Sequence, residues 1–100
     1  MIKHIVFWKL HAEANGLSKA ENAAAIKEKL ENLQGQIEGL IKIEVGINFV
    51  ESAEASDLVL YSEFESKEAL NYYQQHQLHK ACMPFIAEAR SERRVVDYEL

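Results

Sequence analysis

IKIEVGINFV, residues 41–50, alternates apolar and polar side chains almost without interruption. Successive side chains of a strand point to opposite faces, so the apolar ones in this stretch would share one buried face. They are Ile41, Ile43, Val45, Ile47 and Phe49. A polar segment, residues 51–57, follows, and then a second strand-like stretch, LVLYSEF, residues 58–64. The short link between the two predicts an antiparallel hairpin at the centre of the chain.

The residues before this hairpin predict a strand and then a helix. Residues 2–10 are mostly apolar on both faces near their middle, which is typical of a strand that is covered on both sides. HAEANG, residues 11–16, is predicted to be a loop. Ser18 and Glu21 have the spacing of a capping box, which marks the start of a helix. Its apolar stripe comprises Ala23, Ile26, Leu30, Leu33 and Ile37, with Gly35 and Gly39 placed to end it.

The residues after the hairpin repeat the pattern of helix and strand. Ser66 is a good cap for a second helix. Pro84 cannot donate a backbone hydrogen bond, so the helix is expected to kink there or to restart there. Residues 93–100 predict a last strand. The order β-α-β-β-α-β predicts an α+β, ferredoxin-like fold, with a four-stranded antiparallel sheet and both helical layers on one face.

The other face of that sheet is expected to carry apolar side chains too, because no predicted strand has a fully polar side. No segment of the chain remains to cover this face. A second copy of the chain, packed sheet against sheet, would cover it, so we expect a homodimer.

The composition limits the classes of function. One hundred residues predict a single domain over 1–100. The net charge of −5 argues against a nucleic-acid partner. The one basic cluster, Arg90, Arg93 and Arg94, is interrupted by acidic residues, and we interpret it as the solvated end of a helix and start of a strand. Neither a signal peptide nor a membrane-spanning segment is expected. Cys82 is the only cysteine, so it cannot form a disulfide within the chain, and we interpret it as a small buried residue. These observations favour a cytoplasmic location.

Four stretches together resemble the stress-responsive A/B barrel domain family. They are MIKHIVFWKL at the start, Phe64–Ser66, the HxxH segment from His76 to His79, and RRVVDYE near the end. The resemblance implies a dimeric α+β barrel with a cavity between sheet and helices. In one branch of the family the cavity closes polyketide chains without a cofactor, with a helix histidine as base and a tyrosine six residues earlier. The matching residues here are His79 and Tyr73, and His4 matches a strand histidine of the cavity.

The chain departs from the family pattern at three places. Gln77 replaces a proline within the HxxH segment, so we expect the helix to continue there without a bend. Asp57 and Leu58 stand where the cyclase branch has a further histidine. Trp8 is bulky for a cavity wall. These differences bear on the cyclase chemistry more than on the fold.

His79 and Tyr73 are the predicted catalytic pair. An imidazole can remove a proton at neutral pH, and a phenol can stabilise the resulting oxyanion. On one continuous helix, residues six apart point about 120° away from each other. The pair therefore converges only if the helix breaks between them or if a pocket wraps around the helix. The alternative is that both are structural residues, hydrogen-bonded within the core or at its edge.

The remaining candidates are expected to bind a ligand. Predicted ligand-binding residues are His4, Trp8, Ile26, Leu30 and His76. For His4 the competing interpretation is a satisfied core histidine. His76 and His79 supply two metal ligands at most, where zinc takes three or four, so no metal is expected. The sequence contains no Gly-rich phosphate loop, and no cofactor is expected.

Two functions therefore remain open. The first is a dimeric stress-response A/B barrel protein that binds a small hydrophobic molecule between sheet and helices. The second is a cofactor-independent enzyme, similar to a polyketide cyclase, an isomerase or a monooxygenase, that uses His79 with Tyr73.

Overall fold

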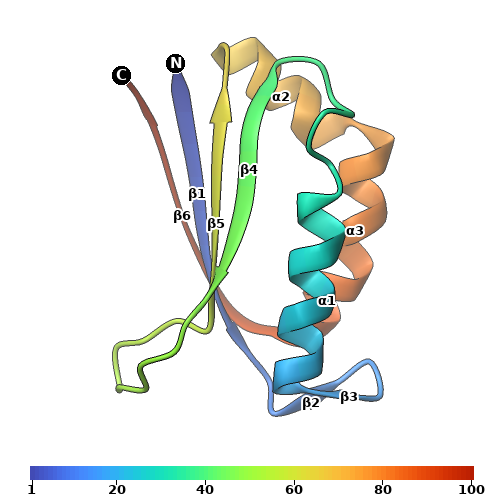
Figure 1. Cartoon of the computed structure of the whole chain (residues 1–100), viewed down its shortest axis with the longest axis vertical. Helices are drawn as coiled ribbons and strands as arrows, with labels where there is room; N and C mark the ends of the chain where they lie inside the picture. Colours follow the sequence, from blue (N-terminus) through green and yellow to red (C-terminus); the bar gives the residue numbers. More distant parts are fainter.

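The computed structural model describes all residues, 1–100. Four strands form one sheet in the order β4-β5-β1-β6, and every neighbouring pair is antiparallel. Their bounds are β1 Ile2–Leu10, β4 Leu40–Ile47, β5 Leu58–Phe64 and β6 Arg90–Glu99. The two ends of the chain lie side by side at one end of the sheet (Figure 1), where the Met1 amino group donates to the Leu100 carbonyl oxygen over 3.3 Å.

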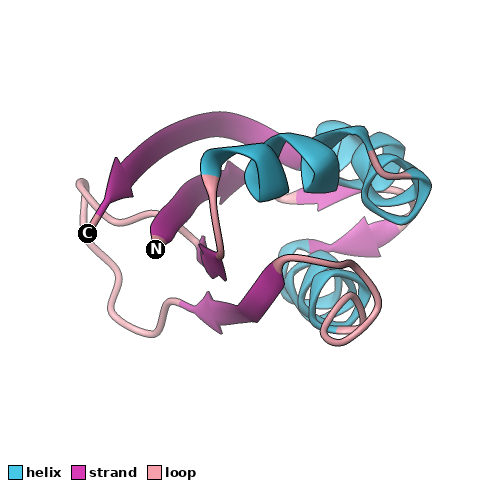
Figure 2. Ribbon diagram, turned by 90° about the horizontal axis from the view of Figure 1, so that it is seen from above, coloured by secondary structure: helices cyan, strands magenta, loops and turns pink.

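Three helices cover one face of the sheet and leave the other face open, as Figure 1 shows with the sheet nearly edge-on. The helices are α1 Lys19–Glu31, α2 Lys67–Gln75 and α3 Gln77–Ala89. Seen from above, the helices again lie to one side of the strands (Figure 2). The predicted ferredoxin-like α+β fold is confirmed. No helix is long and apolar enough to cross a bilayer.

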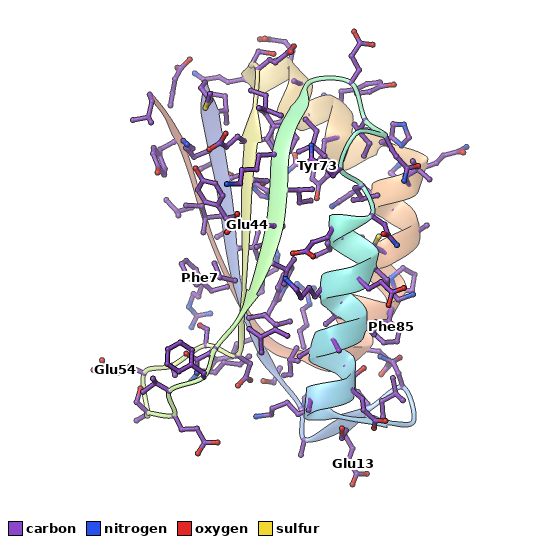
Figure 3. The ribbon with its side chains drawn as sticks, in the orientation of Figure 1. Phe7, Glu13, Glu44, Glu54, Tyr73 and Phe85 are labelled. Atoms are coloured by element: carbon purple, nitrogen blue, oxygen red, sulfur yellow. The ribbon has the colours of Figure 1, made fainter.

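The core lies between the helices and the sheet. Every second residue of β1, from Ile2 to Leu10, is buried on the helix side, and the stripe predicted for the first helix is buried against it. Tyr73 points into this layer, whereas Phe7 lies on the opposite side of the sheet (Figure 3). The Ser18–Glu21 capping box is present at the start of α1.

Two strand predictions are wrong in detail. The pairing of β4 with β5 shifts between Leu40 and Lys42, so Leu40 is buried while Ile41 is 41% exposed. An extra residue in one strand turns its side chain out of the alternation. Ile47, the last residue of β4, is 48% exposed, and Phe49 lies beyond the end of the strand and is 94% exposed, so neither belongs to the buried face. The predicted loop 11–16 instead belongs to a small hairpin, β2 Glu13–Ala14 and β3 Leu17–Ser18, which turns at Asn15 and Gly16 with positive φ angles.

The second helix breaks at a different place from the one predicted. His76 has an extended backbone (φ −67°, ψ 140°) and separates α2 from α3, although no proline is present there. Pro84 lies inside α3, which continues to Ala89. Pro84 is exposed, so the carbonyl group that loses its donor four residues earlier faces the solvent side of the helix.

The open face of the sheet carries a mixture of apolar and charged side chains. Phe7, Val96 and Tyr98 are 38%, 46% and 42% exposed there. Ile5 pairs with Val96 and Phe7 pairs with Arg94, which places these residues on the same side. Exposed apolar side chains gathered on one sheet face are typical of an interaction surface.

Candidate functional site

A cavity of about 120 Å³ lies between the sheet and the helices α1, α2 and α3. Its apolar lining comprises Val6, Trp8, Leu30, Leu60, Met83, Ile86 and Ala87. The polar side chains at the cavity are His4, Tyr73, Gln74, His79, Arg90 and Arg93. An apolar pocket with a few converging polar groups is the usual composition of a small-molecule site.

Tyr73 and His79 meet at this cavity from two different helices. Tyr73 lies near the end of α2 and His79 lies in the first turn of α3. The extended backbone of His76 between them turns the chain, so the ring centroids come within 4.4 Å at an interplanar angle of 50°. One of the two conditions for their convergence, a helix break between them, is therefore met.

Three buried polar side-chain atoms have no hydrogen-bond partner in the protein. They are Trp8 Nε1, the Tyr73 hydroxyl and His79 Nδ1. All three residues line the same cavity. Buried polar groups are normally paired, because leaving one unpaired costs about 1–3 kcal/mol. The unused hydrogen-bonding capacity of the core is thus concentrated at one place.

The protein environment keeps both aromatic candidates neutral. Burial lowers the pKa of His79 from its ordinary value of 6.5, and electrostatic interactions with His4 and Arg93 act in the same direction. The Gln74 backbone opposes this shift, but none of its atoms reaches His79 Nδ1 with good hydrogen-bond geometry. Burial raises the pKa of the Tyr73 hydroxyl, so it stays protonated at neutral pH.

His4 is held from the last strand of the sheet. Its Nδ1 is hydrogen-bonded to the Asp97 carboxylate, and the two residues are paired across β1 and β6. The imidazole is almost fully buried, whereas the Asp97 side chain is 44% exposed. A carboxylate on one ring nitrogen fixes the orientation of the ring and leaves Nε2 for the cavity. The His4 ring lies 6.4 Å from the Tyr73 ring, centroid to centroid.

Five of the seven predicted site residues line the cavity. They are His4, Trp8, Leu30, Tyr73 and His79. Ile26 is fully buried in the core on α1 but does not line it. His76 is also outside: its Nδ1 accepts a hydrogen bond from the Leu78 backbone N–H over 3.0 Å, which caps α3.

Sequence reasoning missed four polar or flexible lining residues, Gln74, Met83, Arg90 and Arg93. The basic cluster of the sequence predicts for both arginines only a solvated end of a helix and start of a strand. No group of three or more His, Cys, Asp or Glu side chains is close enough to hold a metal ion.

Cys82 is a buried free cysteine whose Sγ lies 3.4 Å from the Leu78 carbonyl oxygen, and burial raises the pKa of its thiol.

Comparison with known proteins agrees with this architecture. The model of the stress-responsive A/B barrel domain family matches residues 2–100, which confirms the resemblance stated from the sequence. A dimeric protein of unknown function with a ferredoxin-like fold from Bacteroides fragilis is 35% identical, with a TM-score of 0.86 over 99% of this chain and 95% of that one. No curated protein matches.

More distant structures share the fold alone. A dimeric ferredoxin-like protein of unknown function from Thermobifida fusca is 20% identical, with a TM-score of 0.84 over 99% of this chain and 90% of that one. The hydroxynitrile lyase from Passiflora edulis is 17% identical, with a TM-score of 0.74 over 99% of this chain and 92% of that one.

Proposed function

Because the chain belongs to the stress-responsive A/B barrel domain family, we propose that it acts in a stress response as a homodimer that binds a small hydrophobic molecule between sheet and helices. One observation carries the proposal. Trp8, Tyr73 and His79 all leave a buried polar atom without a protein partner, and all three line the same cavity. A ligand that offers hydrogen-bonding groups would satisfy these atoms.

The size of the cavity limits the ligand. Its volume of about 120 Å³ is close to that of an engineered apolar cavity of about 150 Å³ that holds one benzene molecule. A compact molecule of about one ring therefore fits each subunit. A long polyketide chain would need the cavity to widen.

The open sheet face supports the homodimer. Phe7, Val96 and Tyr98 are partly exposed on it, and nothing within the chain covers them. The related proteins from Bacteroides fragilis and Thermobifida fusca are described as dimeric. Packing this face against a second copy would remove apolar surface from water at about 25 cal/mol per Å². We also place the protein in the cytoplasm, where a free buried thiol such as Cys82 is stable.

The 4.4 Å approach of the Tyr73 and His79 rings favours a second candidate function, a cofactor-independent enzyme. In this proposal neutral His79 takes a proton from a carbon next to a carbonyl group. The electron pair of the broken C–H bond moves onto the carbonyl oxygen, and the protonated Tyr73 hydroxyl donates a hydrogen bond to that oxyanion. The proton returns to the product from His79, so no cofactor is consumed.

Native mass spectrometry of the purified protein tests the first proposal. A dimer of twice 11.4 kDa with extra mass that is lost on denaturation would support it. A monomer would contradict the homodimer. Retained mass that persists unchanged in a Tyr73→Phe, His79→Ala double variant would contradict the cavity as the binding place.

The enzyme candidate is tested with small ketones in deuterated water. His79→Ala should abolish deuterium exchange at the carbon next to the carbonyl, while the far-UV circular dichroism stays that of the parent protein. Equal exchange by the parent and the folded variant would eliminate His79 as the base.

A further inference from the structure

A β-bulge in β6 turns two arginines toward the cavity. Trp8 pairs with Arg93 and Leu10 pairs with Arg90, because the register shifts at this point and Ser91 has no partner. Paired residues of an antiparallel sheet point to the same face, and both Trp8 and Leu10 point toward the helices. In a regular strand, residues three apart would point to opposite faces. The bulge is what brings both guanidinium groups to the helix side.

Neither arginine has an acidic partner. The acids nearest along β6 are engaged elsewhere: Glu92 with Lys9 over 3.8 Å, Asp97 with His4, and Glu99 with Lys67 over 3.8 Å. This is unexpected in a chain with 16 acidic and 11 basic residues. Two like charges at the rim of an apolar cavity repel each other, and an anion bound between them would relieve that repulsion.

With the two arginines, the charge and polarity of the lining change from the mouth of the cavity to its interior. Arg93 is exposed and Arg90 is half-buried, so both stand on the side of the cavity that reaches the surface. Leu30 and Ile86 supply apolar walls, and both are almost fully buried. The unpaired polar atoms of Tyr73 and His79 are also buried. The lining of the cavity is therefore cationic at its mouth, whereas inside it is apolar and carries neutral hydrogen-bonding groups.

We propose that the cavity takes a small carboxylic acid of about one ring, with the carboxylate held between Arg90 and Arg93 and the ring inside. A hydroxyl or keto substituent on the ring would meet Tyr73 and His79. The planar guanidinium fork matches a carboxylate with two parallel hydrogen bonds. This inference rests on the proposed small-molecule function and names the class of ligand for the same site.

Calorimetric titration with two matched probes tests it. Salicylate and salicylamide share a ring and a hydroxyl group, and only salicylate carries a carboxylate at pH 7. We expect salicylate to bind about tenfold more tightly, in line with the strength of hydrogen bonds to charged groups. Arg93→Gln and Arg90→Gln should each remove most of that advantage and leave the affinity for salicylamide unchanged.

Arg94→Gln is the matched control. It makes the same change in net charge one residue away, but Arg94 pairs with Phe7 and therefore lies on the opposite face of the sheet. We expect it to leave both affinities unchanged, with the assembly state of every variant measured by native mass spectrometry. An equal loss of salicylate binding in Arg94→Gln and Arg93→Gln would overturn the inference, because a diffuse charge effect would then explain it.

The outcomes separate this inference from the proposed function. Equal binding of the two probes would overturn the carboxylate assignment and leave the small-molecule site standing. Tighter binding of phenyl phosphate than of salicylate would overturn it as well. If neither ring compound bound, the proposed function would fail, and the assignment of a carboxylate ligand would fail with it.

Discussion

The rings of Tyr73 and His79 lie 4.4 Å apart, although the two residues belong to different helices. The break at His76 creates this contact, since on one continuous helix the two side chains would diverge by about 120°. His76 also caps the helix that follows the break, since its Nδ1 accepts a hydrogen bond from the Leu78 N–H. The geometry of the candidate site is therefore coupled to a residue that does not line the cavity.

Removing the cap should weaken α3 from its first turn. His76→Ala is expected to lower the free energy of unfolding by about 0.5–2 kcal/mol, which is typical for loss of a side chain that caps a helix. His76→Asn should retain the parent stability, because Asn can accept the same hydrogen bond. Urea denaturation measures both. Equal stability of the alanine variant and the parent would show that the cap does not hold the break.

Two fully buried hydroxyl groups should respond differently to removal. The Ser62 hydroxyl donates to the His4 carbonyl oxygen over 2.8 Å, whereas the Tyr73 hydroxyl has no protein partner. Ser62→Ala should cost about 0.5–1.5 kcal/mol because it removes a buried hydrogen bond. Tyr73→Phe should leave the unfolding free energy unchanged or raise it, while it weakens ligand binding. A large loss of stability in Tyr73→Phe would contradict a binding role for its hydroxyl.

Stability should fall in mild acid because of His79. Its pKa is lowered in the folded protein, so below its ordinary pKa of 6.5 the unfolded chain binds more protons than the folded one. The free energy of unfolding therefore decreases as the pH falls from 6.5 toward the folded pKa. Urea denaturation at pH 7.5 and pH 5.5 measures the slope. His79→Gln should reduce it, and an identical slope in the variant would rule out this cause.

Neighbouring valines offer a matched test of the open sheet face. Val95 and Val96 are both 46% exposed, but Val95 pairs with Val6 on the helix side and Val96 pairs with Ile5 on the open side. Val96→Asp should convert the dimer to a monomer or an aggregate, because it would bury a charge in the interface. Val95→Asp should leave the dimer intact. Light scattering after size exclusion distinguishes them, and the reverse result would move the interface to the other face.

Two glycines before β4 should differ in their tolerance of alanine. Both have positive φ angles, 78° at Gly35 and 87° at Gly39. A Cβ at Gly39 would lie 2.6 Å from the Ala69 Cβ, whereas one at Gly35 would meet nothing within 4 Å. We expect a cost of about 1–2 kcal/mol for Gly35→Ala and about 2–5 kcal/mol for Gly39→Ala. Similar losses would mean that α2 moves to accommodate the added methyl group.

The order of elements could be predicted because alternation and capping are local signals. The alternation in residues 58–64 and the Ser18–Glu21 box each act within a few residues, and both appear in the structure. The helix break carries no such signal, since Gln77 is a good helix former and the only proline lies further on, inside α3. α2 packs against the sheet and α3 packs against α1, and no local pattern in the sequence records these contacts.

Only part of the candidate site could be predicted, because only some of its residues follow local patterns or the family resemblance. The family resemblance and the strand alternation placed His4, Trp8, Tyr73 and His79 together, and the cavity contains all four. Arg90 and Arg93 could not be found this way, because a bulge changes the face on which a residue lies without changing the composition of the strand. Asp97 was seen only as a residue of the last strand. Its partner His4 is 93 positions away.

The sheet also constrains the order in which the protein can form during synthesis. β1 is made first of the four strands, whereas its neighbour β6 is made last. A nascent chain can pair β1 with β5, but one edge of β1 stays open until β6 has left the ribosome. Contacts so distant in sequence slow folding, and open strand edges favour pairing between chains. During translation, the β1 edge is therefore open to pairing with another chain until β6 closes it.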